Sequence, residues 1–506
     1  MDKIIVIDFG SQYSQLIVRK LRSLHVYCEL YPYDMDKNVF NDLDIKGIIL
    51  SGGPKSVYDL DSYQLDKVIF DLGLPILGIC YGMQLIAEHF GGKVVRSDTR
   101  EYGKKFIDIL DHNSLFLGLR DTEQVWMSHG DYVSDIGPNL EILATSDGII
   151  SSIKHKTLKI YGTQFHLEVN HTTNGMHMLE NFIKLCQIEA TWYMSNYIEM
   201  AVKDIKETVG NDKVLMAISG GVDSSVAANL IHLAIKDNLT CLFIDHGLLR
   251  LNEAEKVMSL FKDTYHIHVV KVDARDYFLS RLKGISDPEQ KRKIIGDCFI
   301  KTFEQEARKF GDYAYLGQGT LYTDVIESGT KTAEVIKSHH NVGGLPKDMS
   351  FKLLEPLNKL FKDEVRDLGL ALNMDERLIK RQPFPGPGLA IRILGEITNE
   401  KIRIVQETDH ILDEEIKKAK LDQTIWQYFT VCTDSLSVGV MGDKRSYEYV
   451  LAIRAVTSKD GMTADWARIP YDVLEVISRR MVNEVKGINR IVLDITSKPP
   501  ATIEWE

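Results

Sequence analysis

The segment 78–82, Gly-Ile-Cys-Tyr-Gly, places a thiol where a short apolar run ends and a helical pattern begins. Residues 75–79 are typical of a buried strand, and residues 83–90 are typical of a helix that two glycines end. The flanking glycines permit the sharp strand-to-helix turn of the nucleophile elbow G-x-S-x-G, with cysteine in place of serine. Because the positive end of a helix favours the thiolate, we predict that Cys80 is a nucleophile.

A histidine and a carboxylate that could activate this thiol follow another predicted strand. His166 and Glu168 are two residues apart. A thiol nucleophile needs a base, and the imidazole of that base needs a carboxylate to orient it. We therefore predict a triad of Cys80, His166 and Glu168, and we expect the backbone N–H groups of Gly53 and Tyr81 to stabilise the oxyanion. The alternative is a buried cysteine in a tight turn and an unrelated surface histidine beside an acid.

A loop of small residues joins a second predicted strand, residues 214–218, to a helical stretch. Small residues let backbone N–H groups and hydroxyls approach an anion, and the helix N-terminus adds its dipole. The glycine spacing matches neither the Walker A loop nor G-x-G-x-x-G. We predict an anion-binding loop, and the alternative is a helix capped after a tight turn. The loop consists of Ser219, Gly220, Gly221, Val222, Asp223, Ser224 and Ser225.

The elements around these groups alternate short β-branched runs with helical stretches, which indicates α/β layers. This pattern covers residues 1–190, and a long amphipathic helix over residues 191–210 precedes a second α/β region. In the second region a strand at 214–218, a helix to about residue 235 and a strand at 240–244 form a βαβ unit.

Residues 383–388 contain three prolines and two glycines, so they can form neither a helix nor a central strand. We interpret this loop as a domain boundary. Beyond it we expect helices at 401–418 and 471–485 and strands at 447–456 and 490–495. The fold class that we predict is α/β: two consecutive parallel-sheet domains, residues 1–190 and 191–380, followed by a small α+β domain, residues 381–506.

The composition of the 506 residues is that of an ordinary globular protein, with 44% hydrophobic and 26% charged residues. The 61 basic and 72 acidic side chains give a net charge of −11, which disfavours a broad surface for nucleic acid or anionic membranes. No apolar run reaches the length of about 18 residues that a membrane span needs. The six cysteines are far apart and form no CxxC motif, so we expect a reduced, cytoplasmic protein without disulfides or a zinc knuckle.

Four segments of the first region together resemble the class I glutamine amidotransferase domain, over about residues 1–187. They are LGICYGMQ, SGGP, VWMSHGD and TQFHLEV. The resemblance implies that Cys80 attacks the side-chain amide of glutamine, that His166 is first base and then acid, and that Glu168 orients His166. Leu167 stands where that family usually has proline, which leaves open how firmly this loop is held. The resemblance also implies glutamine contacts from Gln84, Ser128, Gly130 and Asp131.

The segment SGGVDS is similar to the PP-loop of ATP pyrophosphatases, which have an adenine-nucleotide alpha hydrolase-like fold and transfer AMP from ATP to an oxygen. The resemblance implies that loop 219–225 holds the pyrophosphate. It makes Asp223 a candidate ligand of Mg²⁺ and Lys362 a mobile cation on the phosphates. After the next strand we expect Asp-Asn-Gly, but this chain has His246 in the middle position, and we expect a loop histidine without a catalytic role.

Five later segments look like the glutamine-hydrolysing GMP synthetase family, so the match runs from residue 4 to residue 506. They lie at 317–328, 337–346, 381–396, 437–443 and 496–506. The family implies that ATP adenylates the C2 oxygen of xanthosine 5′-monophosphate (XMP). Ammonia from glutamine then displaces AMP, so that GMP, AMP, pyrophosphate and glutamate are the products of this carbon–nitrogen ligase. It also implies a homodimer formed through the C-terminal domain. XMP contacts are expected from Arg292, Arg392, Lys498, Thr502 and Glu504.

Other functions fit the residues less well. Another PP-loop amidotransferase with a different adenylated acceptor stays open. The glutamine-dependent NAD synthetases use a Glu-Lys-Cys glutaminase, and asparagine synthetase uses an N-terminal cysteine, whereas Cys80 is internal. A tRNA-modifying PP-loop protein is disfavoured by the net charge of −11. A non-catalytic binder would be expected to have lost part of the triad or of the loop.

Overall fold

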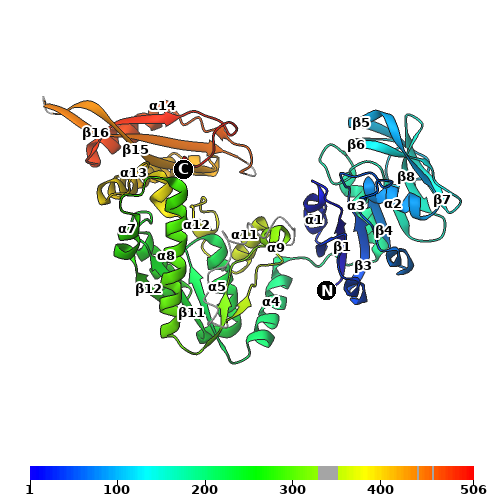
Figure 1. Cartoon of the computed structure of the whole chain (residues 1–506), viewed down its shortest axis with the longest axis horizontal. Helices are drawn as coiled ribbons and strands as arrows, with labels where there is room; N and C mark the ends of the chain where they lie inside the picture. The colour runs from blue at the N-terminus through cyan, green and yellow to red at the C-terminus, as the bar shows by residue number, and fades with distance from the viewer. Residues whose placement is uncertain (329–350, 442–443, 459–460) are drawn as a thin grey trace. The chain divides into compact units, whose positions relative to one another are not determined.

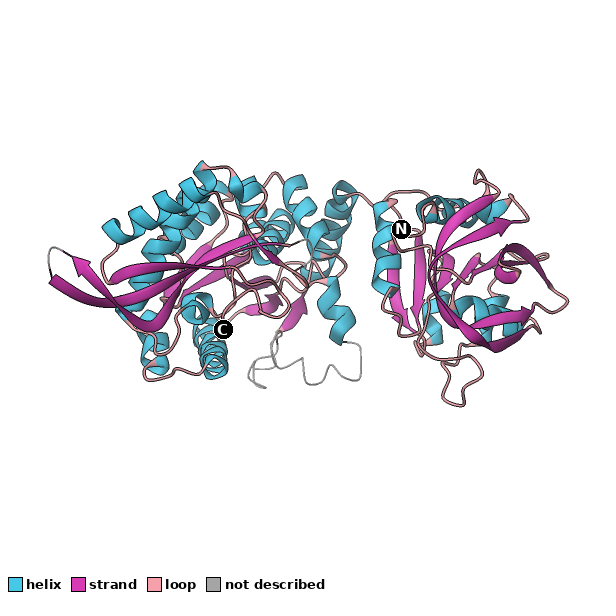
Figure 2. Cartoon of the chain, turned by 90° about the horizontal axis from the view of Figure 1, so that it is seen from above, coloured by secondary structure: helices cyan, strands magenta, loops and turns pink. Residues whose placement is uncertain are grey.

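The structure is a computed structural model, and it describes residues 1–328, 351–441, 444–458 and 461–506. Two parts of the family resemblance, segment 337–346 and positions 442–443, lie outside the described residues. The chain divides into two compact units, Met1–Asn196 and Tyr197–Glu506, each with its own sheets and helices (Figures 1 and 2). No helix among the described residues is long and apolar enough to cross a membrane.

The first unit contains a mixed sheet with the strand order β2-β1-β3-β4-β9-β8-β7-β5-β6. Every residue of β4 and β9 is buried, as expected for parallel strands covered on both faces. The predicted α/β class is confirmed, and the structure adds antiparallel strands on one side of the parallel part. The parallel strands are β1 (Lys3–Asp8), β2 (Cys28–Pro32), β3 (Ile45–Leu50), β4 (Ile76–Ile79) and β9 (Ile160–Thr163). The antiparallel strands are β5 (Lys93–Ile109), β6 (Thr122–Asp135), β7 (Leu140–Ser146) and β8 (Ile149–His155).

Three α-helices accompany this sheet among the described residues: α1 (Ser14–Ser23), α2 (Tyr81–His89) and α3 (Gly175–Cys186). Helix α2 follows β4 directly, with one residue, Cys80, between them. The strand-to-helix junction that the sequence predicts at the thiol is therefore present, and it lies in the parallel part of the sheet.

The second unit begins with helix α4 (Met194–Val209), which overlaps the boundary, and contains a five-stranded parallel sheet in the order β12-β11-β10-β13-β14. The predicted strands at 214–218 and 240–244 correspond to the two central neighbours β10 and β11. The strands are β10 (Lys213–Ile218), β11 (Leu239–Asp245), β12 (Val269–Asp273), β13 (Tyr313–Gly317) and β14 (Lys352–Leu354). The helices around them are α5 (Val222–Ile235), α6 (Glu253–Ser259), α7 (Arg275–Leu282), α8 (Pro288–Lys309), α9 (Tyr322–Ser328), α11 (Lys362–Ala371) and α12 (Glu376–Ile379).

The C-terminal part of this unit pairs a long hairpin with two helices (Figure 1). Strand β16 is central, because it pairs antiparallel with β15 and β17 and parallel with β18. The elements are α13 (Asn399–Lys418), β15 (Gln427–Met441), β16 (Lys444–Thr457), β17 (Asp465–Trp466), α14 (Tyr471–Glu484) and β18 (Ile488–Asp494).

One cluster of buried side chains runs through both parts of the second unit. It contains Leu242 and Phe278 from the parallel-sheet part and Leu389, Ile404 and Leu451 from the C-terminal part. The two regions therefore share a hydrophobic core. The division of this unit at residue 380 stays a prediction.

Candidate active sites

The backbone at Cys80 is strained, with φ at +53° and ψ at −102°. Two glycines make this turn fit: a Cβ on Gly78 would lie 2.4 Å from the carbonyl carbon of Gly82, and a Cβ on Gly82 would lie 2.4 Å from the carbonyl oxygen of Leu50. The Cys80 N–H donates to the carbonyl of Thr163 at 2.7 Å, which fixes the turn to β9. Strain of this kind persists only where the surroundings impose it, and it is typical of a catalytic nucleophile.

His166 and Glu168 form the second half of the triad, and both are buried. The Nδ1 atom of His166 lies 2.6 Å from Oε1 of Glu168. Burial alone would lower the pKa of His166, but the charge of Glu168 and the hydrogen bond to Cys80 outweigh it and raise the pKa well above its ordinary value. A Cβ on Gly52 would lie 3.1 Å from Cε1 of His166 and 3.8 Å from Cβ of Cys80. The structure therefore brings the three predicted triad residues together.

The loop that carries His166 and Glu168 is tightly packed although Leu167 replaces proline. The side chain of Leu167 is 1% exposed. A Cβ on Gly175 would lie 1.9 Å from the carbonyl oxygen of Leu167. The His166 N–H donates to the carbonyl of Trp126 at 3.0 Å, and the hydroxyl of Thr172 donates to the carbonyl of His166 at 2.5 Å. Close packing and two hydrogen bonds thus hold this loop in one conformation without the fixed φ angle of a proline.

The two expected oxyanion donors belong to the turns that follow the neighbouring parallel strands β3 and β4. Tyr81 is the first residue of α2, so its N–H has no intrahelical acceptor. Gly53 belongs to the turn after β3, and a Cβ there would lie 3.2 Å from Cγ of Tyr81. The two predicted donors are therefore close neighbours.

The expected glutamine-binding residues gather beside the thiol. Nε2 of Gln84 donates to the carbonyl of Asp131 at 3.1 Å, and the Cys80 thiol lies 3.9 Å from the carbonyl oxygen of Ser128. The carboxylate of Asp131 accepts hydrogen bonds from Ser56 and Tyr58. Gly130 has open space where a side chain would stand.

Sequence reasoning missed two groups at this site. Nε2 of Gln164 lies 3.6 Å from Sγ of Cys80, and the ring of Tyr13 makes an edge contact with His166 at a centroid distance of 5.0 Å. Gln164 stands two residues before His166, so its place at the end of β9 was the available signal. Tyr13 comes from the loop after β1, and no local pattern singles it out.

The small-residue loop lies between β10 and α5, as predicted. Gly220 has φ at +73°, and a Cβ there would lie 2.7 Å from Cγ2 of Val257. The hydroxyls of Ser219 and Ser224 are 3.3 Å apart, and Ser219 accepts from the Gly221 N–H at 3.3 Å. These hydrogen bonds are long, so the Ser219 and Ser224 hydroxyls bond only weakly to each other, whereas the Ser225 hydroxyl donates to the carbonyl of Gly221 at 2.7 Å.

Asp223 lies in the first turn of α5 and faces a lysine from α11. Its Oδ2 atom lies 3.1 Å from Nζ of Lys362, whose side chain is 56% exposed. Its Oδ1 atom is buried and has no hydrogen-bond partner among the described residues. An acceptor oxygen that is left over in this way fits a bound cation. No group of three or more His, Cys, Asp or Glu side chains that could hold a metal occurs among the described residues, so other ligands would have to come from elsewhere.

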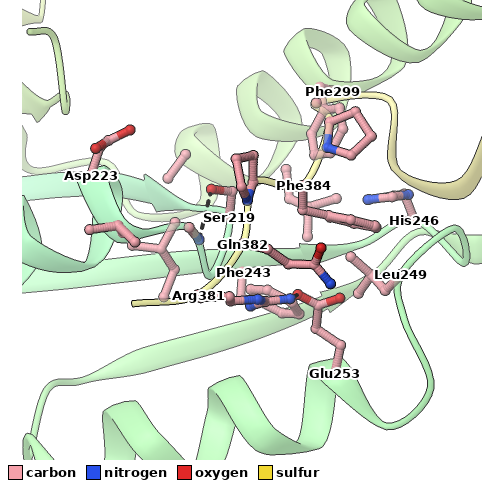
Figure 3. Close-up of a pocket in the computed structure, with 18 of the residues that line it drawn as sticks. Ser219, Asp223, Phe243, His246, Leu249, Glu253, Phe299, Arg381, Gln382 and Phe384 are labelled. Atoms are coloured by element: carbon pink, nitrogen blue, oxygen red, sulfur yellow. Dashed lines mark hydrogen bonds and ion pairs between the residues drawn. The ribbon is translucent and has the colours of Figure 1, made fainter. Parts of the chain in front are cut away.

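A cavity of about 390 Å³ opens beside the loop (Figure 3). Its charged lining side chains are Asp223, Glu253, Lys362, Arg366 and Arg381. Aromatic and aliphatic side chains also line it, among them Leu242, Phe243, Ile244, Leu249, Phe299 and Phe384. Cations and flat apolar side chains in one cavity suit a ligand that carries phosphates on a flat ring system.

Arg381 supports the loop from the start of the proline-rich segment, and sequence reasoning missed it. Its Nη1 atom donates to the carbonyl of Gly220 at 3.2 Å, and its Nη2 atom pairs with Glu253. The other oxygen of Glu253 accepts from the Arg250 N–H at 2.9 Å. The signal was the position of Arg381 at the start of the proline-rich loop.

His246 lies in the loop after β11, but it is only 4% exposed and lines the cavity. Burial lowers its pKa to about 4, so the imidazole is neutral at neutral pH. The predicted loop position of His246 is confirmed, and the structure adds that the imidazole is part of a ligand-sized cavity.

The residues expected to contact XMP are placed differently from one another. Arg392 is fully buried and donates to Glu504 at 2.9 and 3.1 Å. Nζ of Lys498 donates to the carbonyl of Gly461 at 2.9 Å, and the carbonyl of Thr502 accepts from Arg454 at 3.0 Å. The structure thus brings Arg392 and Glu504 together and holds the C-terminal segment against the unit.

Arg292 does not join this group. Its side chain is 41% exposed and lies 3.5 Å from Glu289 on the surface of α8. Its neighbour Lys291 is fully buried instead and donates to the carbonyl of Ile393 at 2.6 Å and to Glu506 at 2.7 Å. A run of charged residues gave no indication of which cation faces inward.

Comparisons with known proteins also place two different kinds of domain in the two parts of the chain that hold these sites. The model of the class-I glutamine amidotransferase family matches residues 5–186, the NAD synthase model matches residues 194–427, and the model of the GMP synthase C-terminal domain matches residues 414–505. Three relatives named GMP synthase [glutamine-hydrolyzing] match over 507 residues, which cover 100% of this chain and 99% of each relative. They come from Exiguobacterium sibiricum, Geobacillus kaustophilus and Bacillus cytotoxicus and are 58%, 59% and 58% identical. With identity of this size over the whole length, the chain belongs to the glutamine-hydrolysing GMP synthase family.

Proposed function

We propose that this protein converts XMP to GMP, using ATP to activate the purine and glutamine to supply the nitrogen. The observation that carries the proposal is that one chain of this family holds both a buried Cys-His-Glu cluster and a loop of small residues beside a cavity of about 390 Å³. A glutaminase alone would not need the cavity, and an AMP-transferring enzyme alone would not need the triad.

In the glutaminase reaction the thiolate of Cys80 attacks the side-chain carbonyl carbon of glutamine. The N–H groups of Gly53 and Tyr81 stabilise the oxyanion, and His166 gives its proton to the departing ammonia. A thioester forms as the carbon–nitrogen bond breaks. His166, held by Glu168 at 2.6 Å, then takes a proton from water, which hydrolyses the thioester to glutamate and restores the thiol. Gln84, Ser128, Gly130 and Asp131 are the proposed contacts of the glutamine.

In the synthetase reaction the C2 oxygen of XMP attacks the α-phosphorus of ATP, and pyrophosphate leaves. The N–H groups and hydroxyls of loop 219–225 bind the departing pyrophosphate, and Lys362 balances its charge. Ammonia then attacks C2 and displaces AMP. The loss of a proton from the entering nitrogen completes GMP.

Mg²⁺ is part of this proposal, because phosphate and the carboxylate of Asp223 carry like charges at one helix N-terminus. The unpartnered Oδ1 atom of Asp223 fits a ligand of Mg²⁺, which proteins commonly hold through one or two carboxylates and the substrate's phosphates. When bound, the ion neutralises charge on the pyrophosphate. Asp223 would hold the ion, and Lys362, whose Nζ atom lies 3.1 Å from Oδ2 of Asp223, supplies a second cation.

The acceptor XMP would bind near the C-terminal segment. Arg392 offers a buried Nη1 atom without a hydrogen-bond partner among the described residues, while its other nitrogens hold Glu504. This supports Arg392 as a group that both binds XMP and positions Glu504. Lys498 and Thr502 remain in the proposed contact set, and Arg292 belongs to it only if its exposed side chain turns toward the phosphate.

A homodimer is also proposed, and an apolar face on the long hairpin supports it. Leu436, Val438 and Val440 alternate along β15, so they lie on one face, and Val438 pairs with Tyr447 of β16. All four side chains are 49–74% exposed. Sedimentation analysis should give a dimer, and Val438→Asp should shift it to the monomer. A dimer that survives this change would place the interface elsewhere.

A cytoplasmic location completes the proposal, together with small-molecule substrates rather than nucleic acid or membranes as partners. All six cysteines are free and buried, which suits a reducing compartment.

The experiment that tests the function is one incubation with XMP, ATP, Mg²⁺ and glutamine, followed by separation of the nucleotides. Equal amounts of GMP and AMP, together with glutamate, are expected. Glutamate without GMP would keep the glutaminase and reject XMP as the acceptor. No glutamate but GMP with added ammonium would reject the triad instead.

A further inference from the structure

The cavity beside the phosphate loop has a buried imidazole in its apolar wall. His246 is 4% exposed, and Figure 3 shows it near Phe384 at the end of the cavity away from Asp223. Its ring lies 5.1 Å from the ring of Phe299 and 5.7 Å from that of Phe278, between centroids. A Cβ on Gly388 would lie 2.9 Å from Cε1 of His246, so the ring has little room to turn.

The protonation state of this ring follows from its surroundings. The Leu248 N–H donates to Nδ1 of His246 at 3.3 Å, so Nδ1 carries a lone pair. Burial lowers the pKa of His246 to about 4 although the charges of Asp245 and Glu253 oppose this. In a neutral ring whose Nδ1 accepts, the proton is on Nε2. Nε2–H is therefore a fixed donor.

This donor has no protein acceptor among the described residues, since the one hydrogen bond of the His246 side chain is the one to Nδ1. The Nε2 atom is not one of the fully buried polar atoms that lack a partner, and His246 lines the cavity, so Nε2–H is open to a ligand there. A ligand that offers an acceptor at this point can take the hydrogen bond.

The position of the donor indicates which part of a ligand it meets. Asp223 of the phosphate loop lies on one side of the cavity, and His246, Phe299 and Phe384 lie on the other (Figure 3). A nucleotide whose phosphates are held at the loop therefore points its base toward His246, where Phe299 and Phe384 provide flat surfaces. The edge of a purine presents ring nitrogens, which are hydrogen-bond acceptors.

We propose that His246 is a specificity-determining residue that donates a hydrogen bond from Nε2–H to a ring nitrogen of the adenine of ATP. This inference rests on the proposed function, in which ATP occupies this cavity. It assigns a role to the position at which the chain has histidine in place of the expected asparagine.

The test compares His246→Leu, which removes the donor, with His246→Gln, which keeps an N–H donor. GMP formation from added ammonium is followed at varied ATP and saturating XMP. His246→Leu should raise the KM for ATP about tenfold, leave the KM for XMP unchanged, and have less effect on kcat. His246→Gln should recover most of the loss. A kcat loss with unchanged KM for ATP would contradict the inference.

Analogues of ATP that lack one ring nitrogen locate the acceptor. With 1-deaza-, 3-deaza- and 7-deaza-ATP, the wild-type protein should lose about tenfold in kcat/KM for one of the three. His246→Leu should lose nothing further with that same analogue, because the partner is already gone. If the ratio of kcat/KM between the wild-type protein and His246→Leu is the same for ATP and for all three analogues, the inference is overturned.

The outcomes separate the inference from the function on which it rests. If the wild-type protein forms no GMP from ATP and XMP, the proposed function fails. If it forms GMP but ignores all three substitutions in the base, only the role of His246 fails, and this result needs no variant. Should His246→Leu not fold, as judged by circular dichroism, His246→Ala, which also lacks the donor, replaces it in the analogue series.

Discussion

The triad site and the phosphate-loop site are built on the same kind of junction, a parallel strand followed by a helix. The polar groups are closely paired at the triad site and partly unpaired at the phosphate-loop site. At the triad, His166 and Glu168 are buried and 2.6 Å apart, and the elbow backbone is strained in advance. At the loop, hydroxyls are 3.3 Å apart, and Asp223 keeps one oxygen without a partner among the described residues.

The difference fits the proposed role of each site. A nucleophile must be activated by the protein's own groups, so its charges are paired inside the fold. A loop that binds a highly charged ligand must leave its donors and one acceptor available, so its charges are balanced only when the ligand and its cation arrive. Variants at the first site should therefore separate the two reactions, and variants at the second should stop both.

The largest difference between glutamine-dependent and ammonium-dependent GMP formation is expected from Cys80→Ala. Without the thiol, glutamine-dependent GMP formation should fall at least about 1,000-fold, while formation from added ammonium continues. The measurement is GMP formed from each nitrogen source. Cys186→Ala is the matched control, because burial raises the pKa of this thiol to about 12 and it lies in α3, outside the site. Loss of the ammonium route in Cys80→Ala would contradict the separation of the two sites.

Asp223→Asn should instead lower GMP formation from glutamine and from added ammonium alike, by about 100-fold. The amide keeps the shape but removes the charge that a cation needs. Alkylation of Cys80 by iodoacetamide should continue at the wild-type rate, since the triad is intact. Asp363→Asn changes an exposed carboxylate of α11 next to Lys362 and should leave both routes unchanged. GMP formation that survives in Asp223→Asn would reject the role of this carboxylate.

Glu168→Gln should have an intermediate effect, limited to the glutamine route. The charge of Glu168 helps to raise the pKa of His166, so its removal should lower that pKa and reduce the share of imidazolium paired with thiolate at neutral pH. Glutamine-dependent formation should fall about 10- to 100-fold. Titration of the His166 resonance by NMR, assigned with His166→Gln, checks the direction. An unchanged or higher pKa in the variant would be evidence against this pairing.

The sequence was sufficient where the chemistry depends on neighbours along the chain. Cys80 and loop 219–225 each lie at one strand-to-helix junction, and glycines at fixed offsets mark both. His166 and Glu168 are two residues apart, so their mutual contact needed only the correct strand end.

The sequence was insufficient where burial depends on distant segments. His246 is enclosed partly by Gly388, and Arg381 reaches Gly220 across a sequence separation of 161 residues. Lys291 is buried because carbonyls near residue 393 and Glu506 accept from it, whereas Arg292 next to it is exposed. Strand β15 was also missed, because its bulge near residues 432–436 interrupts the alternation on which strand prediction depends.

The smallest expected effect concerns stability, and it compares the two buried histidines. The raised pKa of His166 means that its contribution to stability is present at low pH and is lost as the pH rises through that pKa. The pKa of His246 is lowered to about 4, so the unfolded chain binds more protons below its ordinary pKa of about 6.5, and stability is lost as the pH falls.

His246→Gln removes this loss of stability at low pH. Between about pH 7.5 and pH 6 the wild-type protein should therefore lose about 1 kcal/mol more stability than the variant. This difference corresponds to about 2 °C in the melting temperature of the second unit, followed by scanning calorimetry. Because the rest of the chain is identical, its own titrations cancel in the difference between the two proteins. Parallel curves would mean that the imidazole takes up its proton without leaving the folded cavity, which a ring enclosed by Phe299, Phe278 and Gly388 should not allow.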